Sequence, residues 1–322
     1  MENREIDVII PVYRPDEKLH RLLLALEAQT VKPSRILLVN TEEALFDPRC
    51  LEGTRGVQVV HIRKSEFDHG GTRHMAAGLL QGAFLLFLTQ DAVPADEHLI
   101  EELLRPFEEA GEESCGGERP QVCAAYARQL PAKDCNVLER YTRSFNYGKE
   151  SRIKTAADLP ELGIKTFFCS NVCAMYRRSA YEELGGFERR TIFNEDMIFA
   201  GHAVEAGYQI AYAADAQVIH SHNYTAMQQL HRNFDLGVSQ ADHPEVFGRL
   251  HSEGEGIRLV KKTAKWLVEN GHVLLLPQLV MASGSKYAGY WLGKHYKKLP
   301  DGLIRSLTMN PAYWEGEAGD GR

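Results

Sequence analysis

Short apolar runs alternate with amphipathic stretches over the first two thirds of the chain. Residues 6–12 form a β-branched run, and residues 18–29 place Leu19, Leu22 and Leu26 at the spacing of one helical face. The same alternation of strand and helix patterns continues to about residue 220. It predicts an α/β fold with a mostly parallel sheet that helices cover on both faces.

The individual elements follow from the same patterns. The predicted strands span residues 6–12, 35–40, 57–62, 84–88, 121–128, 166–176, 209–213 and 217–220. The predicted helices span residues 18–29, 72–81, 97–109, 179–184 and 194–207. Residues 136–161 are polar and aromatic without a clear period, which indicates a long loop or several short helices. From about residue 224 onward the pattern is helical only.

Composition and charge exclude several classes of protein. The net charge of −7, from 37 basic and 44 acidic residues, argues against a nucleic-acid partner. The N-terminus has charges where a signal peptide needs an apolar centre, and no apolar run reaches the roughly 18 residues of a membrane span. The six cysteines show no CxxC or zinc spacing, so we expect reduced thiols. A cytoplasmic protein is predicted.

A lone carboxylate follows the most apolar strand. Residues 84–88 run directly into Thr89, Gln90 and Asp91. In open α/β sheets, ligands bind at the edge where the strands have their carboxyl ends. Asp91 is therefore a candidate ligand to Mg²⁺ or Mn²⁺ that bridges phosphate oxygens; the alternative is a turn or cap residue before Pro94.

Two further motifs carry candidate chemistry. Glu195 and Asp196 stand at a helix start, either to complement the helix dipole or as a general base. Adjacent helical residues point about 100° apart, so at most one faces the substrate, and the sequence does not choose between them. His220 and His222 point the same way in an extended strand. They indicate a Mn²⁺ ligand, or else one buried and one surface histidine.

A glycine pair precedes the predicted helix 72–81. Free N–H groups of Gly70 and Gly71 at such a helix start suit a phosphate, and Arg73 adds a forked cation. The motif is neither GxxxxGK[ST] nor GxGxxG. The alternative is a tight turn with a surface arginine.

Taken in order, these segments resemble glycosyltransferase family 2, the inverting enzymes with a GT-A fold. The resemblance is carried by the segments VIIPVYRP, HGGTRHMAAGLLQGAFLLFLTQDAVP, CSNVCAMYRRSAYEELGGF, NEDMIFAGHAVEAG and VIHSH. The most similar subgroup is that of the bacterial rhamnosyltransferases, in which TQDA replaces DxD and the tail resembles SKYAGYWLGKHYKKLP. The resemblance implies a mixed Rossmann-like sheet with helices on both faces. It implies a GT-A domain over residues 1–225, with a nucleotide-sugar half (1–110) and an acceptor half (120–225), and a helical extension over residues 226–322.

The resemblance also assigns roles to single residues. Pro11, Tyr13 and Arg14 border the nucleotide base, and Asn40, Thr41 and Glu42 stand where the family has acidic residues that read the base or ribose. Gly71, Arg73 and His74 lie near the diphosphate. Gln90 and Asp91 supply the metal motif, and His220 matches the distal metal ligand better than His222. Asp196 matches the base with Glu195 in support, and Ser170 and Asn171 fall in the acceptor cleft.

The implied activity is that of a metal-dependent hexosyltransferase that uses Mg²⁺ or Mn²⁺. It would move L-rhamnose from dTDP-rhamnose onto a glycan or lipid-linked saccharide in bacterial cell-surface polysaccharide synthesis. A UDP-sugar donor, a nucleotidyltransferase and a non-catalytic sugar-nucleotide-binding protein are the alternatives. The last is favoured by the single acid of TQDA.

The tail mixes basic and aromatic residues. Residues 257–267 predict an amphipathic helix, and residues 285–298 combine tyrosines and Trp291 with lysines. Such a surface suits the headgroup zone of an anionic membrane, which would make the protein peripheral on the inner face of the cell membrane. The alternative is a helix that packs on the catalytic domain or on a second subunit in a homodimer.

Overall fold

The computed structural model describes residues 5–112, 121–248 and 253–319. Within them the strands form one sheet in the order β3-β2-β1-β4-β8-β6-β9-β5, and β7 also pairs with β9. The strands are β1 (Ile6–Val12), β2 (Arg35–Thr41), β3 (Val57–Ile62), β4 (Phe84–Leu88), β5 (Val93–Pro94), β6 (Val122–Leu130), β7 (Arg152–Lys154), β8 (Cys173–Arg177) and β9 (Gln209–Ile219). This confirms the GT-A-like mixed sheet that the resemblance implied.

The two halves of the sheet differ in strand direction. β3, β2, β1 and β4 are all parallel. β8 is antiparallel to both β4 and β6, β6 is parallel to β9, and β5 and β7 are antiparallel to β9. The prediction of a mostly parallel sheet is therefore right for the first half. The second half is mixed, because only β6 and β9 are parallel there, while β8, β5 and β7 are antiparallel to the strands that they pair with.

Helices cover both faces of the sheet, as predicted. The alternation of side chains along β1 sends Ile9 to one face and Val8 and Ile10 to the other, and all three are fully buried. On the Ile9 face lie α2 (His69–Gly78), α6 (Arg178–Glu183) and α7 (Glu195–Glu205), and on the opposite face lie α1 (Glu17–Glu27) and α3 (Leu99–Glu112). Burial of each such side chain contributes roughly 1.5–3 kcal/mol.

Several element boundaries differ from the prediction. The region 166–176 is not one strand, because residues 163–167 form a 3-10 turn and only β8 is extended. The two strands predicted at 209–213 and 217–220 are the single long strand β9. Residues 136–161 contain the short helices α4 (Val137–Asn146) and α5 (Leu159–Leu162), which confirms one of the two alternatives. Most of the predicted boundary between the two halves, residues 113–120, lies outside the described residues.

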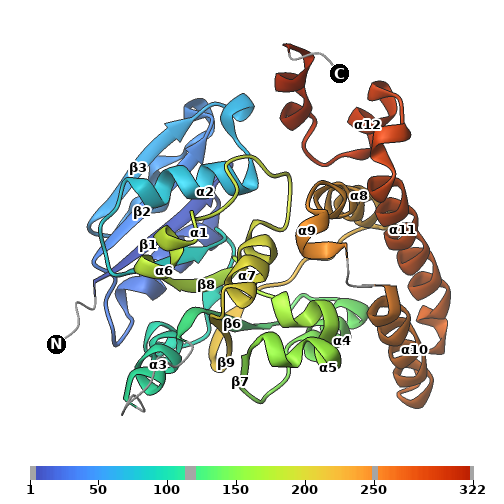
Figure 1. The fold of residues 1–322 in the computed structure, drawn as a ribbon, viewed down its shortest axis with the longest axis horizontal. Helices are drawn as coiled ribbons and strands as arrows, with labels where there is room; N and C mark the ends of the chain where they lie inside the picture. Colours follow the sequence, from blue (N-terminus) through green and yellow to red (C-terminus); the bar gives the residue numbers. More distant parts are fainter. Residues whose placement is uncertain (1–4, 113–120, 249–252, 320–322) are drawn as a thin grey trace.

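A helical extension stands beside the sheet (Figure 1). It consists of α8 (Ala226–Asp242), α9 (Pro244–Phe247), α10 (Glu253–Glu269), α11 (Leu276–Lys294) and α12 (Asp301–Leu307). α8 and α11 run against each other, and a small core joins α8 and α12 to the loop before α7 through Phe234, Ile304 and Ile192. Among the described residues, no helix combines the length and apolar character needed to cross a membrane. The division of the chain at residue 225 stays a prediction.

Candidate active site

Asp91 lies in a tight turn at the carboxyl end of β4. The five residues of β4 are all buried, and the turn is fixed by a hydrogen bond of 3.1 Å from the N–H of Thr89 to the carbonyl of Val172. Gln90 uses both ends of its amide to hold the backbone of Tyr13, at 2.9 and 3.1 Å. This clamp ties the end of β1 to the turn, so the Asp91 carboxylate is presented at the edge of the sheet.

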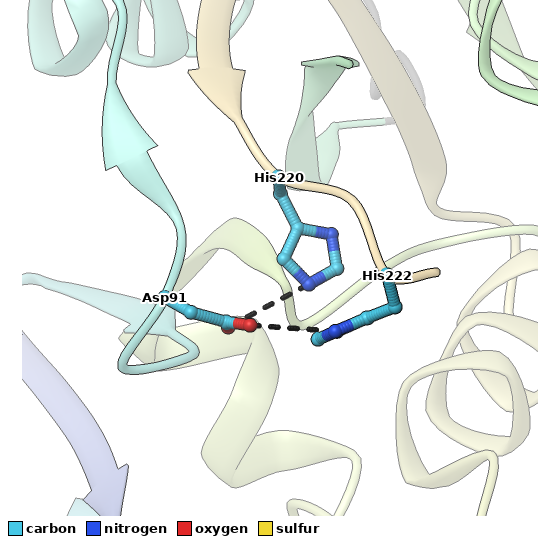
Figure 2. A group of neighbouring side chains, drawn as sticks. All are labelled: Asp91, His220 and His222. Atoms are coloured by element: carbon cyan, nitrogen blue, oxygen red, sulfur yellow. Dashed lines mark ion pairs between the residues drawn. The ribbon is translucent and has the colours of Figure 1, made fainter. Parts of the chain in front are cut away.

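Two histidines from the end of β9 meet the Asp91 carboxylate (Figure 2). Nε2 of His220 lies 3.6 Å from Oδ1 of Asp91, and Nε2 of His222 lies 3.4 Å from Oδ2. The ligand atoms of all three residues lie within 4.8 Å of one another. The structure thus brings Asp91 and His220 together as the sequence analysis expected, and it adds His222 to the same group.

The hydrogen bonds of Gln129 on β6 fix the orientation of His220. The side-chain Nε2 of Gln129 lies 2.5 Å from the Tyr147 hydroxyl and 3.0 Å from the Ser170 hydroxyl, so Oε1 is its acceptor end. Oε1 lies 3.0 Å from Nδ1 of His220 and also accepts from Arg143. His220 must therefore carry its proton on Nδ1, which leaves the lone pair of Nε2 directed at Asp91.

This group of donors fits a divalent transition metal. One carboxylate and two imidazoles suit Mn²⁺ better than Mg²⁺, which prefers oxygen ligands. Burial lowers the pKa of His220 well below its usual value, and burial also lowers that of His222 although Asp91 opposes it. Both rings are therefore neutral near pH 7, as metal ligands must be.

The carboxylates of Glu195 and Asp196 have separate environments at the start of α7. Glu195 is 4% exposed, and its Oε1 lies 3.3 Å from Nη1 of Arg73 and accepts a hydrogen bond of 3.0 Å from the Asn171 amide. Asp196 is partly exposed and accepts from the backbone N–H groups of Asn171 and Met197 at 2.9 and 2.8 Å. Of the two side chains, only that of Asp196 is partly exposed.

The two carboxylates also differ in pKa. Burial acts to raise the pKa of Glu195, but Arg73, His69 and the Asn171 amide outweigh it and lower the pKa. For Asp196, burial and the neighbouring Glu195 anion raise the pKa to about 7, against its two backbone hydrogen bonds. A partly exposed carboxylate with a raised pKa is a candidate general base.

Ser170 and Asn171 connect the metal-ligand group to the Glu195–Asp196 pair. The Ser170 hydroxyl accepts from Gln129, which in turn holds His220. The next residue, Asn171, binds both Asp196 and Glu195 and accepts a hydrogen bond of 2.8 Å from the Tyr176 hydroxyl. The sequence analysis expected these two residues in the acceptor cleft; in the structure they support the groups around it, and their contact with an acceptor stays a prediction.

The residues expected around the nucleotide base lie at the ends of β1 and β2. Tyr13 is 39% exposed, and Arg14 lies over its ring at 5.2 Å with a positive φ of 50°. Asn40 is buried, and its side chain donates to the Glu42 carbonyl and contacts His61 Nδ1, both at 3.0 Å. Pro11 is partly exposed, Thr41 is buried and Glu42 is partly exposed. Their roles toward a base stay predictions.

The expectation of free N–H groups at Gly71 is wrong. Helix α2 begins at His69, not at residue 72, with Asp68 as its N-cap, and the Asp68 carboxylate accepts from Gly71 N at 2.7 Å. A Cβ at Gly70 or Gly71 would lie 2.2 Å from a carbonyl of Glu188 or Arg189, so the glycines allow close backbone contact. A side-chain carboxylate already occupies this helix start, which leaves no phosphate cradle there.

Arg73 and His74 differ from the expectation in a similar way. Arg73 is 4% exposed and pairs with Glu195, so it is not a surface arginine. His74 is partly exposed and faces Tyr181 and the backbone of Gly186. Within the part of the chain that the structure describes, neither Arg73 nor His74 contacts Asp91, His220 or His222.

The sequence analysis missed the residues that support the site from behind. The side-chain amide of Gln129 forms hydrogen bonds with both Arg143 and Tyr147. No role was predicted for any of these three residues. One signal was present: Gln129 follows Arg128 near the end of the mainly apolar strand β6, and its side chain is only 2% exposed. A buried amide in a strand needs partners, but the sequence does not say which.

The chain is similar to known glycosyltransferases in sequence and in fold. Residues 7–185 match the family Glycosyl transferase family 2. The chain is 38% identical to O-antigen chain rhamnosyltransferase RfbN of Salmonella typhimurium, over 96% of both chains. It is 40% identical to O-antigen chain rhamnosyltransferase WbaN of Salmonella anatum, over 95% of both chains. A similar solved structure is that of the mannosyltransferase PcManGT of Pyrobaculum calidifontis in complex with GDP-Man and Mn²⁺, with a TM-score of 0.52, 16% identity, and coverage of 98% of this chain and 86% of that one.

The fold is that of the GT-A glycosyltransferases, with helices added at the C-terminus. By the match over more than half of its length, and by relatives near 40% identity over nearly the whole chain, the chain belongs to glycosyl transferase family 2.

Proposed function

We propose that this chain is an inverting, metal-dependent rhamnosyltransferase that moves L-rhamnose from dTDP-rhamnose onto a saccharide acceptor in cell-surface polysaccharide synthesis. The observation that carries the proposal is the pairing of a metal-ligand group, Asp91 with His220 and His222, with a partly exposed base, Asp196. The likeness to two O-antigen rhamnosyltransferases over at least 95% of the chain supports the choice of sugar.

Asp196 takes the proton of the attacking acceptor hydroxyl in this mechanism. Its raised pKa matches it to proton transfer near neutral pH, and a positioned base is typically worth about 10²–10⁴-fold in rate. Attack by the hydroxyl from the side opposite the leaving nucleoside diphosphate inverts the anomeric centre. A direct displacement of this kind needs a base but no covalent nucleophile. Glu195 stays ionised beside Arg73 and keeps Asp196 in a negative environment.

The Asp91 group serves the leaving diphosphate. Asp91, His220 and His222 would hold the ion, for which Mn²⁺ suits the donor set better than Mg²⁺. When bound, such an ion neutralises charge on the departing diphosphate oxygens. Gln129 keeps His220 in the required tautomer, and Arg143, bonded to the same amide oxygen, adds positive charge near the group.

A panel of sugar nucleotides tests the proposal. Thermal unfolding and transfer are measured with dTDP-rhamnose, UDP-glucose, UDP-N-acetylglucosamine and GDP-mannose, each with Mn²⁺ or Mg²⁺. A donor at about 100 times its Kd stabilises the protein by about 2.7 kcal/mol. We expect dTDP-rhamnose with Mn²⁺ to give the largest shift and to release dTDP slowly without acceptor. If only a UDP-sugar stabilises the protein, the donor is a UDP-sugar and not dTDP-rhamnose. Stabilisation by a sugar nucleotide without any turnover would favour a non-catalytic binding protein.

We also propose that this enzyme works in the cytoplasm, in peripheral contact with the inner face of an anionic membrane through the α10–α11 hairpin. Leu274 is 90% exposed, Val280 69% and Met281 61%. Helix α10, which precedes these residues in the chain, carries the exposed lysines Lys261, Lys262 and Lys265. Apolar tips beside lysines suit the headgroup zone. Co-sedimentation with phosphatidylglycerol vesicles, but not with phosphatidylcholine vesicles, is expected. A stable dimer without lipid binding would assign the surface to a second subunit.

A further inference from the structure

A cavity of about 650 Å³ opens beside the Asp91 group. Helix α4 forms one wall, and α8, α10 and α11 of the C-terminal extension form the others. His222 and Tyr224 line its inner end, and His222 also contacts Asp91 at 3.4 Å. A molecule in this cavity would therefore lie directly against the residues that face the donor diphosphate. The volume falls within the range of about 300–1,000 Å³ that is usual for small-ligand sites.

The lining is mainly apolar but also carries hydrogen-bonding groups and aromatic rings. Aliphatic side chains such as Leu138, Leu236 and Leu279 form the floor. Between them stand amides and hydroxyls, including Gln229, Asn233 and Gln240, and the three rings of Tyr224, Tyr287 and Tyr290. A saccharide presents hydroxyl groups to amides and flat C–H faces to aromatic rings, so both kinds of lining have a partner in it.

Two charged groups in the lining distinguish a saccharide from a hydrocarbon chain. Lys286 on α11 is partly buried, and no hydrogen bond or ion pair joins its ammonium to any described residue. Glu139 on α4 uses Oε1 to bind Arg143 at 2.6 Å, whereas Oε2 makes no hydrogen bond within the described ranges. Burial lowers the pKa of Lys286 and Glu139 opposes this, which shows that the two charges lie within electrostatic reach. An alkyl chain would leave the Lys286 ammonium and Oε2 of Glu139 without a hydrogen-bond partner in a dry site, at a substantial cost.

We infer that this cavity holds the saccharide acceptor, so that the C-terminal helices form half of the acceptor site and Lys286 and Glu139 select for its hydroxyl groups. The inference rests on the proposed transferase function. It gives the extension a catalytic purpose beyond stability: α8, α10 and α11 hold the acceptor beside the donor.

Binding of p-nitrophenyl hexopyranosides to the full chain tests the inference. It is measured by saturation-transfer NMR with dTDP and Mg²⁺, which is diamagnetic and does not broaden the ligand signals. Ala282 on α11 lines the cavity, whereas Ala288 on the same helix is exposed. We expect the native protein and Ala288→Trp to bind at least one glycoside of the panel, and Ala282→Trp to lose that binding. Lys286→Met removes a charged hydrogen-bond donor and should weaken binding about tenfold or more, whereas the exposed Lys298→Met should not change it.

Three results would overturn the inference. The first is that no glycoside binds the native protein. The second is that Ala282→Trp, folded by circular dichroism, binds as well as the native chain. The third is that the hydrocarbon probe 1-anilinonaphthalene-8-sulfonate fluoresces in the native protein and not in Ala282→Trp while glycoside binding stays. Failure of the proposed function is a separate observation: no sugar nucleotide of the panel would then release its nucleoside diphosphate, whatever the cavity binds.

Discussion

The guanidinium of Arg73 lies 3.3 Å from the carboxylate of Glu195, and both side chains are about 5% exposed. This buried pair gives the two adjacent acids different environments. Glu195 has a dedicated cation, while Asp196 has only backbone N–H donors and faces the anion of its neighbour. Helical geometry does not distinguish the two acids, and the difference between them comes from Arg73 of α2, which is more than a hundred positions away along the chain.

Asp196→Asn should lower the transfer rate by about 10²-fold or more and leave the donor KM unchanged, because the amide keeps the shape but takes no proton. The native rate should rise with pH through about 7, since only the deprotonated carboxylate is a base. Initial rates between pH 5 and 9 measure both effects. A near-normal rate from the purified variant would remove Asp196 from the mechanism.

The same substitution should stabilise the fold at high pH. The pKa of Asp196 is raised in the folded state, so the folded protein binds a proton that the unfolded chain has released, and stability falls as pH rises from about 4 to about 7. Asp196→Asn has no such proton. Urea unfolding at pH 5 and pH 8 should show that the native protein loses more stability than the variant between the two values. Equal losses of stability in the native protein and the variant would mean that the pKa of Asp196 is not raised in the folded state.

Arg73→Met should cost about 3–5 kcal/mol of unfolding free energy near neutral pH, because it leaves the Glu195 carboxylate buried without its cation. The lowered pKa of Glu195 means that the native pair contributes stability above the unfolded pKa, and that this contribution is lost as pH falls through the folded pKa. The variant keeps His69 and the Asn171 amide but loses Arg73, so burial acts more strongly to raise the pKa of Glu195. The stability that the variant loses relative to the native protein should therefore shrink toward acid pH. Urea titrations at pH 5 and pH 8 measure this trend.

The exposed pair of Arg63 and Glu66 provides the control, with side chains 77% and 47% exposed. Arg63→Met should leave the free energy of unfolding essentially unchanged at either pH, because solvent screens an exposed ion pair. Equal changes in the free energy of unfolding for Arg63→Met and Arg73→Met would show that burial does not strengthen the contribution of the Arg73–Glu195 pair to stability.

Gln129→Leu should weaken Mn²⁺ binding by about 10–100-fold, because His220 loses the acceptor that holds its proton on Nδ1. Gln129→Glu keeps an acceptor oxygen for both His220 and Arg143 and should retain most of the affinity. Titration of free Mn²⁺ by electron paramagnetic resonance measures the affinity directly. The exposed strand residue Gln58 provides the control substitution Gln58→Leu. Unchanged affinity in Gln129→Leu would deny Gln129 this positioning role.

Local patterns predicted the first half of the fold well. β1 to β4 and α1 are short, self-contained apolar or amphipathic runs, so the strand and helix periods alone place them to within a few residues. Asp91 and His220 were also expected together, but only through resemblance to a family. Strand direction at β8 was not predictable locally, because pairing between β4 and β8 joins segments more than eighty residues apart.

The errors at the site have the same origin. The start of α2 was misplaced because Asp68 caps it and Glu188 packs on Gly70, and the second of these contacts is long-range. Gln129 and the cavity behind His222 were missed because their partners come from α4 and the C-terminal helices. Spacing along the chain carries no information about such contacts.

The contact between α8 and α11 depends on glycines. A Cβ at Gly289 would lie 2.1 Å from the Leu230 carbonyl, and one at Gly293 would lie 2.1 Å from the Phe234 carbonyl, both backbone atoms that cannot yield without moving a helix. Gly289→Ala should therefore destabilise the protein by about 1–3 kcal/mol. Gly284, on the same helix, has open space around it, so Gly284→Ala should gain up to about 1 kcal/mol from helix propensity. Opposite signs in urea unfolding are expected. Two stabilising substitutions would mean that the helices do not touch at Gly289, and the wall that α11 gives to the cavity would then be misplaced as well.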